Sequence, residues 1–98
     1  MTTGPPFSVR TTSAFDRDFR KLAKQHRELV EHYGRAIGIL ENDPHNRSRA
    51  HDIKKLQNVP AGEGQYRLRL ARFRFRYNIA DRVLTLVACN LRREDTYS

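Results

Sequence analysis

Residues 66–80 have the sequence YRLRLARFRFRYNIA, in which apolar residues and arginines alternate along most of the stretch. Such alternation is typical of β-strands that bury one face and expose the other. If Ala71-Arg72 forms a two-residue turn, Leu70 pairs with Phe73 and the rest of a hairpin register follows. That register gathers the apolar side chains on one face and four arginines on the other: Arg67, Arg69, Arg74 and Arg76. A slip of one residue would mix the faces, so the pattern selects the register.

The same pattern continues beyond the hairpin. Asp81-Arg82 has the composition of a second turn, and VLTLVAC (83–89) predicts a buried strand. In this register Leu84 and Leu86 join the apolar face. The residues that alternate with these leucines are expected among the arginines: Thr85 and Val87. The chain from residue 66 on therefore predicts a three-stranded meander with one basic face.

The N-terminal half predicts a short strand followed by helices. Phe7 and Val9 alternate with polar residues, after a segment (1–6) that we expect to be disordered. Further on, residues recur at steps of three and four, as on one face of a helix: Phe15, Phe19, Leu22, His26, Leu29, Tyr33, Ile37 and Leu40. This stripe is too long for one ordinary helix, so we predict a helix hairpin over roughly 13–24 and 27–41.

Local residues suggest where these elements begin and end. Ser13 has the side chain of a helix N-cap, and Asp16 places an acid in the first turn. Asn42-Asp43-Pro44 ends the second helix, because the residue before a proline is pushed out of the α region. Residues 44–52 predict a polar loop and residues 57–64 a turn-rich loop, and Ile53 to Leu56 between them is a short apolar–basic segment.

The composition favours one small domain covering residues 1–98. Hydrophobic residues make up 38% of the chain, which supports a thin core. Cys89 is the only cysteine, so no intramolecular disulfide can form and we expect a reducing, cytoplasmic compartment. The first nine residues do not resemble a signal peptide. No apolar run approaches the roughly 18 residues that a membrane span needs.

Positive charge is concentrated in the second half of the chain. Residues 1–43 have a net charge of +1 and residues 44–98 a net charge of +7, which together give the formal +8. Arginine supplies 15 of the 19 basic residues, and its planar guanidinium suits phosphate oxygens. This balance argues against a metabolic enzyme with a deep pocket and favours a polyanionic partner.

The hairpin arginines predict a phosphate site. Each guanidinium can donate paired hydrogen bonds to phosphate oxygens, and arginines on rigid strands can stabilise charge that develops on a reacting phosphate. The alternative is a solvated face that happens to be rich in arginine. Neither the four histidines and one cysteine nor Gly62-Glu63-Gly64 match a metal or phosphate-loop motif, so we expect no cofactor. Near the C-terminus, Tyr97 follows several arginines that would favour its phenolate, which makes it a candidate base.

Several segments, in their order and spacing, resemble the RelE/ParE superfamily of toxins from bacterial and archaeal toxin–antitoxin modules. The resemblance covers nearly the whole chain from Phe7 on, and many relatives have a glycine where this chain has Ala71-Arg72. The segments that carry it are FDRDFRKLAKQ (15–25), ENDP (41–44), KKL (54–56), YRLRLARFRFRY (66–77) and LRREDTY (91–97). The resemblance implies an α+β fold of order β-α-α-β-β-β, with an N-terminal helix hairpin packed on one face of a small, antiparallel-rich sheet.

The resemblance also implies an activity. Members of the RelE branch cleave mRNA, typically in the ribosomal A site, by attack of the substrate 2′-hydroxyl on the adjacent phosphate and without a metal. By position, five residues of this chain match catalytic ones: Arg67 and Arg69 against the phosphate, Arg74 for the phosphoryl transition state, Arg93, and Tyr97 as base or stacking surface. Four more match positions that bind RNA: Lys54, Lys55, Arg76 and Arg92, the last of which could instead take the role of Arg93.

A toxin of this kind has partners. The resemblance implies mRNA, the ribosome and a cognate antitoxin, whose disordered and partly acidic segment folds on this domain in a hetero-oligomer. Two alternatives stay open. A ParE-like inhibitor of DNA gyrase would lack nuclease chemistry and would stay toxic after replacement of Arg74 and Tyr97. An inactive relative would bind only RNA or its antitoxin, and loss of arginines would lower affinity and salt dependence together.

Overall fold

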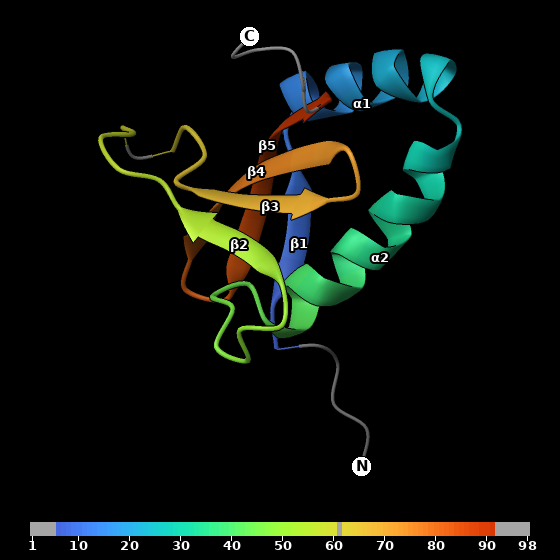
Figure 1. The fold of residues 1–98 in the computed structure, drawn as a ribbon. Helices are drawn as coiled ribbons and strands as arrows, with labels where there is room; N and C mark the ends of the chain where they lie inside the picture. The colour runs from blue at the N-terminus through green and yellow to red at the C-terminus, as the bar shows by residue number, and fades with distance from the viewer. Residues whose placement is uncertain (1–5, 61, 92–98) are drawn as a thin grey trace, which may run out of the picture.

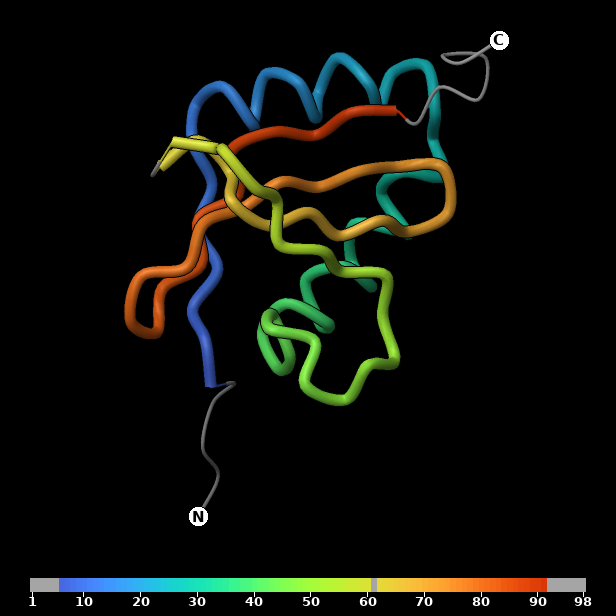
Figure 2. The backbone as a smooth tube through the Cα atoms, turned by 60° about the vertical axis from the view of Figure 1, so that its left-hand side comes forward, coloured from blue at the N-terminus to red at the C-terminus, as the bar shows by residue number. Residues whose placement is uncertain are grey.

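The computed structural model describes residues 6–60 and 62–91 (Figure 1). These residues form two helices and five strands: β1 (Ser8–Thr11), α1 (Ser13–Gln25), α2 (Glu28–Asn42), β2 (Asp52–Lys55), β3 (Tyr66–Leu70), β4 (Phe73–Ala80) and β5 (Val83–Leu91). The strands form one sheet in the order β1-β5-β4-β3-β2, where β1 is parallel to β5 and all other neighbours are antiparallel. Both helices lie on one face of the sheet (Figures 1 and 2), so the predicted α+β fold is confirmed.

The β3–β4 hairpin has the predicted register. Leu70 pairs with Phe73 and Leu68 with Phe75. The turns before β4 and β5 both begin with a left-handed residue, Ala71 at φ 56° and Asp81 at φ 57°. Aspartate tolerates this conformation better than alanine, because its short polar side chain can hydrogen-bond locally.

The prediction of Ser13 as the N-cap of α1 was wrong by one residue. Thr12 is the cap, and its hydroxyl oxygen accepts a 3.1 Å hydrogen bond from the amide of Phe15. The amide of Thr12 donates in turn to the carbonyl of Leu86 at 3.1 Å, which continues the pairing of β1 with β5. Sheet pairing therefore holds Thr12 extended, which is the backbone conformation that an N-cap needs.

The structure adds β2 to the predicted elements. The loop predicted over residues 44–52 ends at His51, one residue earlier than predicted. β2 consists of Asp52 and the first three residues of the segment 53–56 that follows. β2 lies at the edge of the sheet and pairs with β3 alone. Ile53 is its only apolar residue, and a single apolar residue gives no periodicity to detect. Pairing with β3, and not the local sequence, makes this segment a strand.

A β-bulge corrects the register of β5. Tyr77 pairs with Leu86 but Arg76 pairs with Ala88, so one extra residue stands opposite Arg76. Beyond the bulge, Cys89 points into the core, where it is 3% exposed. Without the extra residue Cys89 would face the arginines, and Ala88 would replace it in the core.

The core lies between the helices and the apolar face of the sheet. Its largest buried members are Phe15, Leu29 and Leu40 from the helices and Leu68, Phe73, Phe75, Tyr77, Leu84 and Leu86 from the strands. The Tyr77 hydroxyl donates a 2.7 Å hydrogen bond to the carbonyl of Pro44, and burial raises the pKa of this phenol. The bond fastens β4 to the loop after α2. No helix within the described ranges is long and apolar enough to cross a membrane.

Candidate phosphate-binding site

The sheet face opposite the helices carries six basic side chains. We call it the basic face and define it by Arg10, Lys54, Arg67, Arg69, Arg74 and Arg76. Directly paired residues share a face, and Arg69 pairs with Arg74 as Arg67 pairs with Arg76. Like charges directly opposite destabilise a sheet, so folding stability alone does not favour this arrangement. Thr85 lies on this face, as the alternation predicted, and its pairing with Arg10 adds an arginine that was not predicted there.

Two of these arginines are held by an acid that the hairpin sequence does not contain. Asp52, the first residue of β2, pairs with Arg69 across the strands. Its carboxylate accepts a 2.9 Å hydrogen bond from Nε of Arg69 and a 3.3 Å hydrogen bond from Nη2 of Arg67. These ion pairs reduce the repulsion between the two guanidinium groups and fix their direction.

Other guanidinium atoms of the basic face are buried without a partner. Within the described residues, Nε of Arg67 and Nε of Arg74 are shielded from solvent and make no hydrogen bond. A buried, unpaired donor is costly, especially on a charged group. An anion that binds here would supply the missing acceptors, because phosphate oxygens accept hydrogen bonds from several guanidinium donors at once.

Arg76 is used differently from the other arginines. Its side chain donates to the backbone carbonyls of Gly64 (3.0 and 3.2 Å) and Glu63 (2.9 Å). The side-chain oxygen of Asn78 accepts hydrogen bonds from the backbone amides of Gly64 (2.8 Å) and Gln65 (3.1 Å). Together these bonds lay the loop before β3 over one end of the basic face. Gly64 is required there, because a Cβ would lie 2.9 Å from Cγ2 of Val87 and 3.0 Å from Cβ of Arg76.

The two lysines of β2 point to opposite sides of the strand. Lys54 pairs with Arg67 and shares the basic face, whereas Lys55 pairs with Tyr66, with its ammonium 5.9 Å from the centre of the Tyr66 ring. Both lysines nevertheless border a groove of about 530 Å³ that reaches Arg76. The predicted RNA-binding residues among the described ones therefore line one groove, which extends from β2 to β4.

The predicted residues Arg92, Arg93 and Tyr97 lie outside the described residues. The chain leaves β5 through Asn90, which pairs with Arg74, and Leu91. In the described part of the chain, no three histidine, cysteine, aspartate or glutamate side chains gather as a metal site would require.

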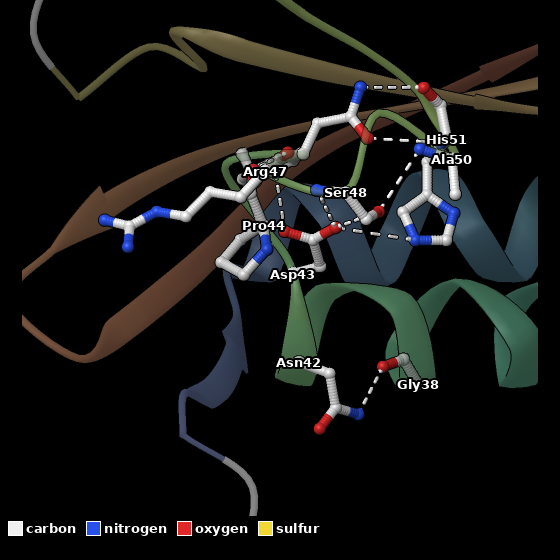
Figure 3. A network of polar contacts seen from close by, with 10 residues as sticks. Gly38, Asn42, Asp43, Pro44, Arg47, Ser48, Ala50 and His51 are labelled. Carbon is white, nitrogen blue, oxygen red and sulfur yellow. Dashed lines mark hydrogen bonds and ion pairs between the residues drawn. The ribbon is translucent and has the colours of Figure 1, made fainter.

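The loop between α2 and β2 places Asp52, and the sequence pattern did not predict its structure. Asp43 caps the loop (Figure 3). Its carboxylate accepts hydrogen bonds from the backbone amides of Arg47 (2.8 Å) and Ser48 (3.2 Å) and from the Ser48 hydroxyl (2.6 Å). The hydroxyl bond is the main reason why the pKa of Asp43 is lowered. The Asn46 side chain exchanges hydrogen bonds with the backbone of His51, at 2.8 and 3.1 Å. The chain therefore enters β2 in a fixed direction.

This loop, α2 and the paired strands β2 and β3 enclose a cleft of about 660 Å³ on the helix side. Asp43, His51, Asp52 and Arg69 contribute polar groups to it, and Leu68 and Leu70 contribute apolar ones. Asp52 and Arg69 thus border both the cleft and the basic face. An Asp-Pro pair followed by asparagine and serine was the available sequence signal for such a capped loop.

Comparison with known proteins identifies two similar solved structures. The archaeal RelE–RelB complex of Pyrococcus horikoshii contains a chain that is 25% identical, with a TM-score of 0.62 over 91% of this chain and 98% of that one. The RelBE2 toxin–antitoxin complex of Mycobacterium tuberculosis contains one that is 21% identical, with a TM-score of 0.59 over 89% and 99%. No protein-family model and no curated protein matches the sequence. The structural likeness over nearly its full length shows that the chain has a RelE-like fold, as the sequence resemblance implied.

Proposed function

We propose that this chain is the toxin of a toxin–antitoxin module and acts as a metal-independent endoribonuclease on mRNA at the ribosome. The two structural neighbours support the toxin assignment, since both belong to complexes of a RelE-type protein with its antitoxin. The nuclease assignment rests on one observation. Arg67, Arg69 and Arg74 are neighbours on two paired strands, and two of them keep buried guanidinium donors unpaired.

In the proposed reaction, the 2′-hydroxyl of the RNA attacks the adjacent phosphorus. The 2′-hydroxyl gives its proton to a base, a bond from O2′ to phosphorus forms, the bond from phosphorus to O5′ breaks, and an acid protonates the departing 5′-oxygen, which leaves a 2′,3′-cyclic phosphate and a 5′-hydroxyl. Negative charge grows on the non-bridging oxygens during this step, and fixed guanidinium groups stabilise it without reorganising. Arg74 is the proposed donor to that charge, with Arg67 and Arg69 holding the phosphate. Tyr97 and Arg93 are proposed to act at the 2′-oxygen and at the leaving group.

The proposed partners follow from the same surface. Lys54, Lys55, Arg76 and Arg92 would bind the flanking RNA or ribosomal RNA, since cationic side chains along a groove track a phosphate backbone. A cognate antitoxin of RelB type is the proposed neutralising partner. An acidic segment of such a protein would compete with RNA for the basic face.

The test is induction of the wild type and of Arg74→Ala in bacteria, with primer extension on a reporter mRNA. We expect growth arrest and new 5′ ends within the translated region for the wild type, and neither for Arg74→Ala. Arg72→Ala is the matched control, because Arg72 lies in the turn two residues away, is 57% exposed and faces Glu28 at 3.9 Å instead of the basic face. Its cleavage should equal that of the wild type.

Other results would support the alternatives. Growth arrest without new 5′ ends, unaffected by Arg74→Ala, would replace the nuclease with an inhibitor of DNA gyrase. A folded chain that causes no arrest would be a relative that binds RNA or antitoxin only. In that case each phosphate-binding arginine removed would still flatten the salt dependence of RNA binding by about one unit of slope.

A further inference from the structure

Asp52 stands out on the basic face because of its charge. Among the strand residues that the structure describes, it is the only acid whose register places it on that face, beside Arg67 and Arg69. A carboxylate so close to a phosphate site lowers the local positive potential on which RNA binding depends. Its presence at this position therefore needs an explanation beyond the general solubility of the surface.

The contacts of Asp52 resemble those of a bound phosphate. Its two oxygens divide between two guanidinium groups, Oδ2 to Arg69 at 2.9 Å and Oδ1 to Arg67 at 3.3 Å. Phosphate oxygens bridge neighbouring arginines in the same way. The Asp52 side chain is also the outer member of the group, 48% exposed against 17% for Arg67 and 29% for Arg69. An incoming anion therefore meets the carboxylate first.

We infer that the Asp52 carboxylate occupies, in the free protein, the place of a substrate phosphate on Arg67 and Arg69, so that RNA must displace it to bind. This inference rests on the proposed function and adds an internal competitor to it. Arg74 has no such acid among the described residues, and its buried Nε stays unpaired. RNA that reaches Arg74 alone would be held weakly, whereas RNA placed over all three arginines would exchange one anion for another. Competition by the Asp52 carboxylate weakens binding to RNA in general and favours RNA that is placed over all three arginines.

The loop after α2 makes this displacement possible. The bonds of Asp43 and Asn46 fix the path of the chain up to His51, and β2 begins at the next residue. The backbone of Asp52 is therefore fixed by pairing with Arg69, while its carboxylate is half exposed and held only by ion pairs. Exposed ion pairs contribute little free energy, so a phosphate can replace them at small cost.

The test measures binding without cleavage. The probe is a fluorescent single-stranded RNA with 2′-O-methyl groups, which lacks the attacking hydroxyl, and the readout is anisotropy over a series of salt concentrations. We expect Asp52→Asn to bind this RNA about threefold or more tightly than the wild type, from one repulsive charge removed at close range. Its plot of log affinity against log salt should be steeper by about 0.7, the value for one additional phosphate contact on a single strand.

Two control variants separate the position of the charge from its sign. Asp81→Asn raises the net charge equally at the β4–β5 turn, tolerates the left-handed backbone and should stay close to the wild type. Asp52→Glu keeps the charge and should also bind like the wild type, and Asp52→Ser should repeat the result of Asp52→Asn. Equal affinities for Asp52→Asn and Asp81→Asn, or weaker binding by Asp52→Asn, would overturn the inference.

A second probe distinguishes this inference from the proposed function. Titration with inorganic pyrophosphate, followed by calorimetry, reads the arginine site without any RNA. The nuclease proposal is decided by primer extension with Arg74→Ala, whereas tighter pyrophosphate binding by Asp52→Asn than by Asp81→Asn supports the competitor even if no variant binds the free RNA. Equal pyrophosphate affinities of the two variants would refute the competitor even if the wild type cleaves mRNA.

Discussion

The two faces of this sheet meet opposite demands, although the same strands build both. On the helix face, Leu68, Phe73 and Phe75 are fully buried under α1 and α2. On the basic face, Arg67 and Arg74 alternate with them and keep buried donors unpaired. Apolar burial is the main favourable term in folding, whereas gathered like charges and unpaired donors oppose it. The comparison shows that the apolar face stabilises the fold. This stability allows the basic face to keep its arginines close together, an arrangement that suits anion binding but does not favour folding.

Neighbouring substitutions on β4 give the most direct test of this comparison. Phe75→Ala should lower the free energy of unfolding by about 3–5 kcal/mol, because it opens a cavity in the core. Arg74→Gln, one residue away, should change it by less than about 1 kcal/mol, because it removes a charge directly opposite Arg69. Urea unfolding followed by circular dichroism measures both. Similar losses for the two variants would show that the basic face also stabilises the fold.

The loop over the basic face allows a finer test. Gly64→Ala should destabilise the protein by about 2 kcal/mol, since the new methyl group meets Val87 and Arg76 at 2.9 and 3.0 Å and the backbone is left-handed at φ +86°. Gly62→Ala is the matched control, with φ +87° and open space around its Cβ, and should cost about 1 kcal/mol. The difference between the two melting temperatures isolates the contact with the basic face. No difference would mean that the loop is not packed against Arg76.

The smallest expected effect is at the turn that both faces share. Ala71→Gly should stabilise the protein by about 0.5 kcal/mol, because glycine adopts the left-handed backbone at φ 56° without the steric cost that alanine has. Asp81→Gly, at φ 57° in the following turn, should give less or nothing, since aspartate already tolerates this conformation. Neither change should alter RNA binding. A gain from Asp81→Gly that equals the gain from Ala71→Gly would contradict the steric explanation.

The sequence predicted what depends on local alternation and little of what depends on distant partners. The hairpin register followed from the spacing of apolar residues and arginines between Tyr66 and Ile79, because a one-residue slip exposes the core. The helix hairpin followed from the apolar stripe, with ends within one residue of those observed. The N-cap was misplaced by one residue, since both Thr12 and Ser13 can cap and only the pairing of Thr12 with β5 decides between them.

For the candidate site, the sequence predicted the arginines but not their neighbours. Asp52 is 17 residues from Arg69 in the chain. The four residues of β2 contain no sequence pattern that predicts a strand. Arg10 joins the basic face only because β1 is parallel to β5, a pairing across most of the chain. Arg76 occupies the same kind of position in the alternating sequence as the other arginines. Its guanidinium nevertheless donates hydrogen bonds to backbone carbonyls of the loop before β3. Each of these features is set by contacts between segments that have no common local signal.

The position of β5 has a consequence for how the molecule comes into being. β5 stands between β1 and β4, packs beneath α1 and comes last in the chain among the strands of residues 6–60 and 62–91 (Figure 2). β1 therefore cannot pair until β5 has been synthesised, because Ser8 pairs with Val83. Contacts between residues so far apart in the sequence are slow to form. A nascent chain that is released before β5 would leave the apolar sides of α1 and β4 uncovered and would be a substrate for proteases. A protein proposed to stop translation can thus acquire its rigid arginine surface only after its own translation has passed β5.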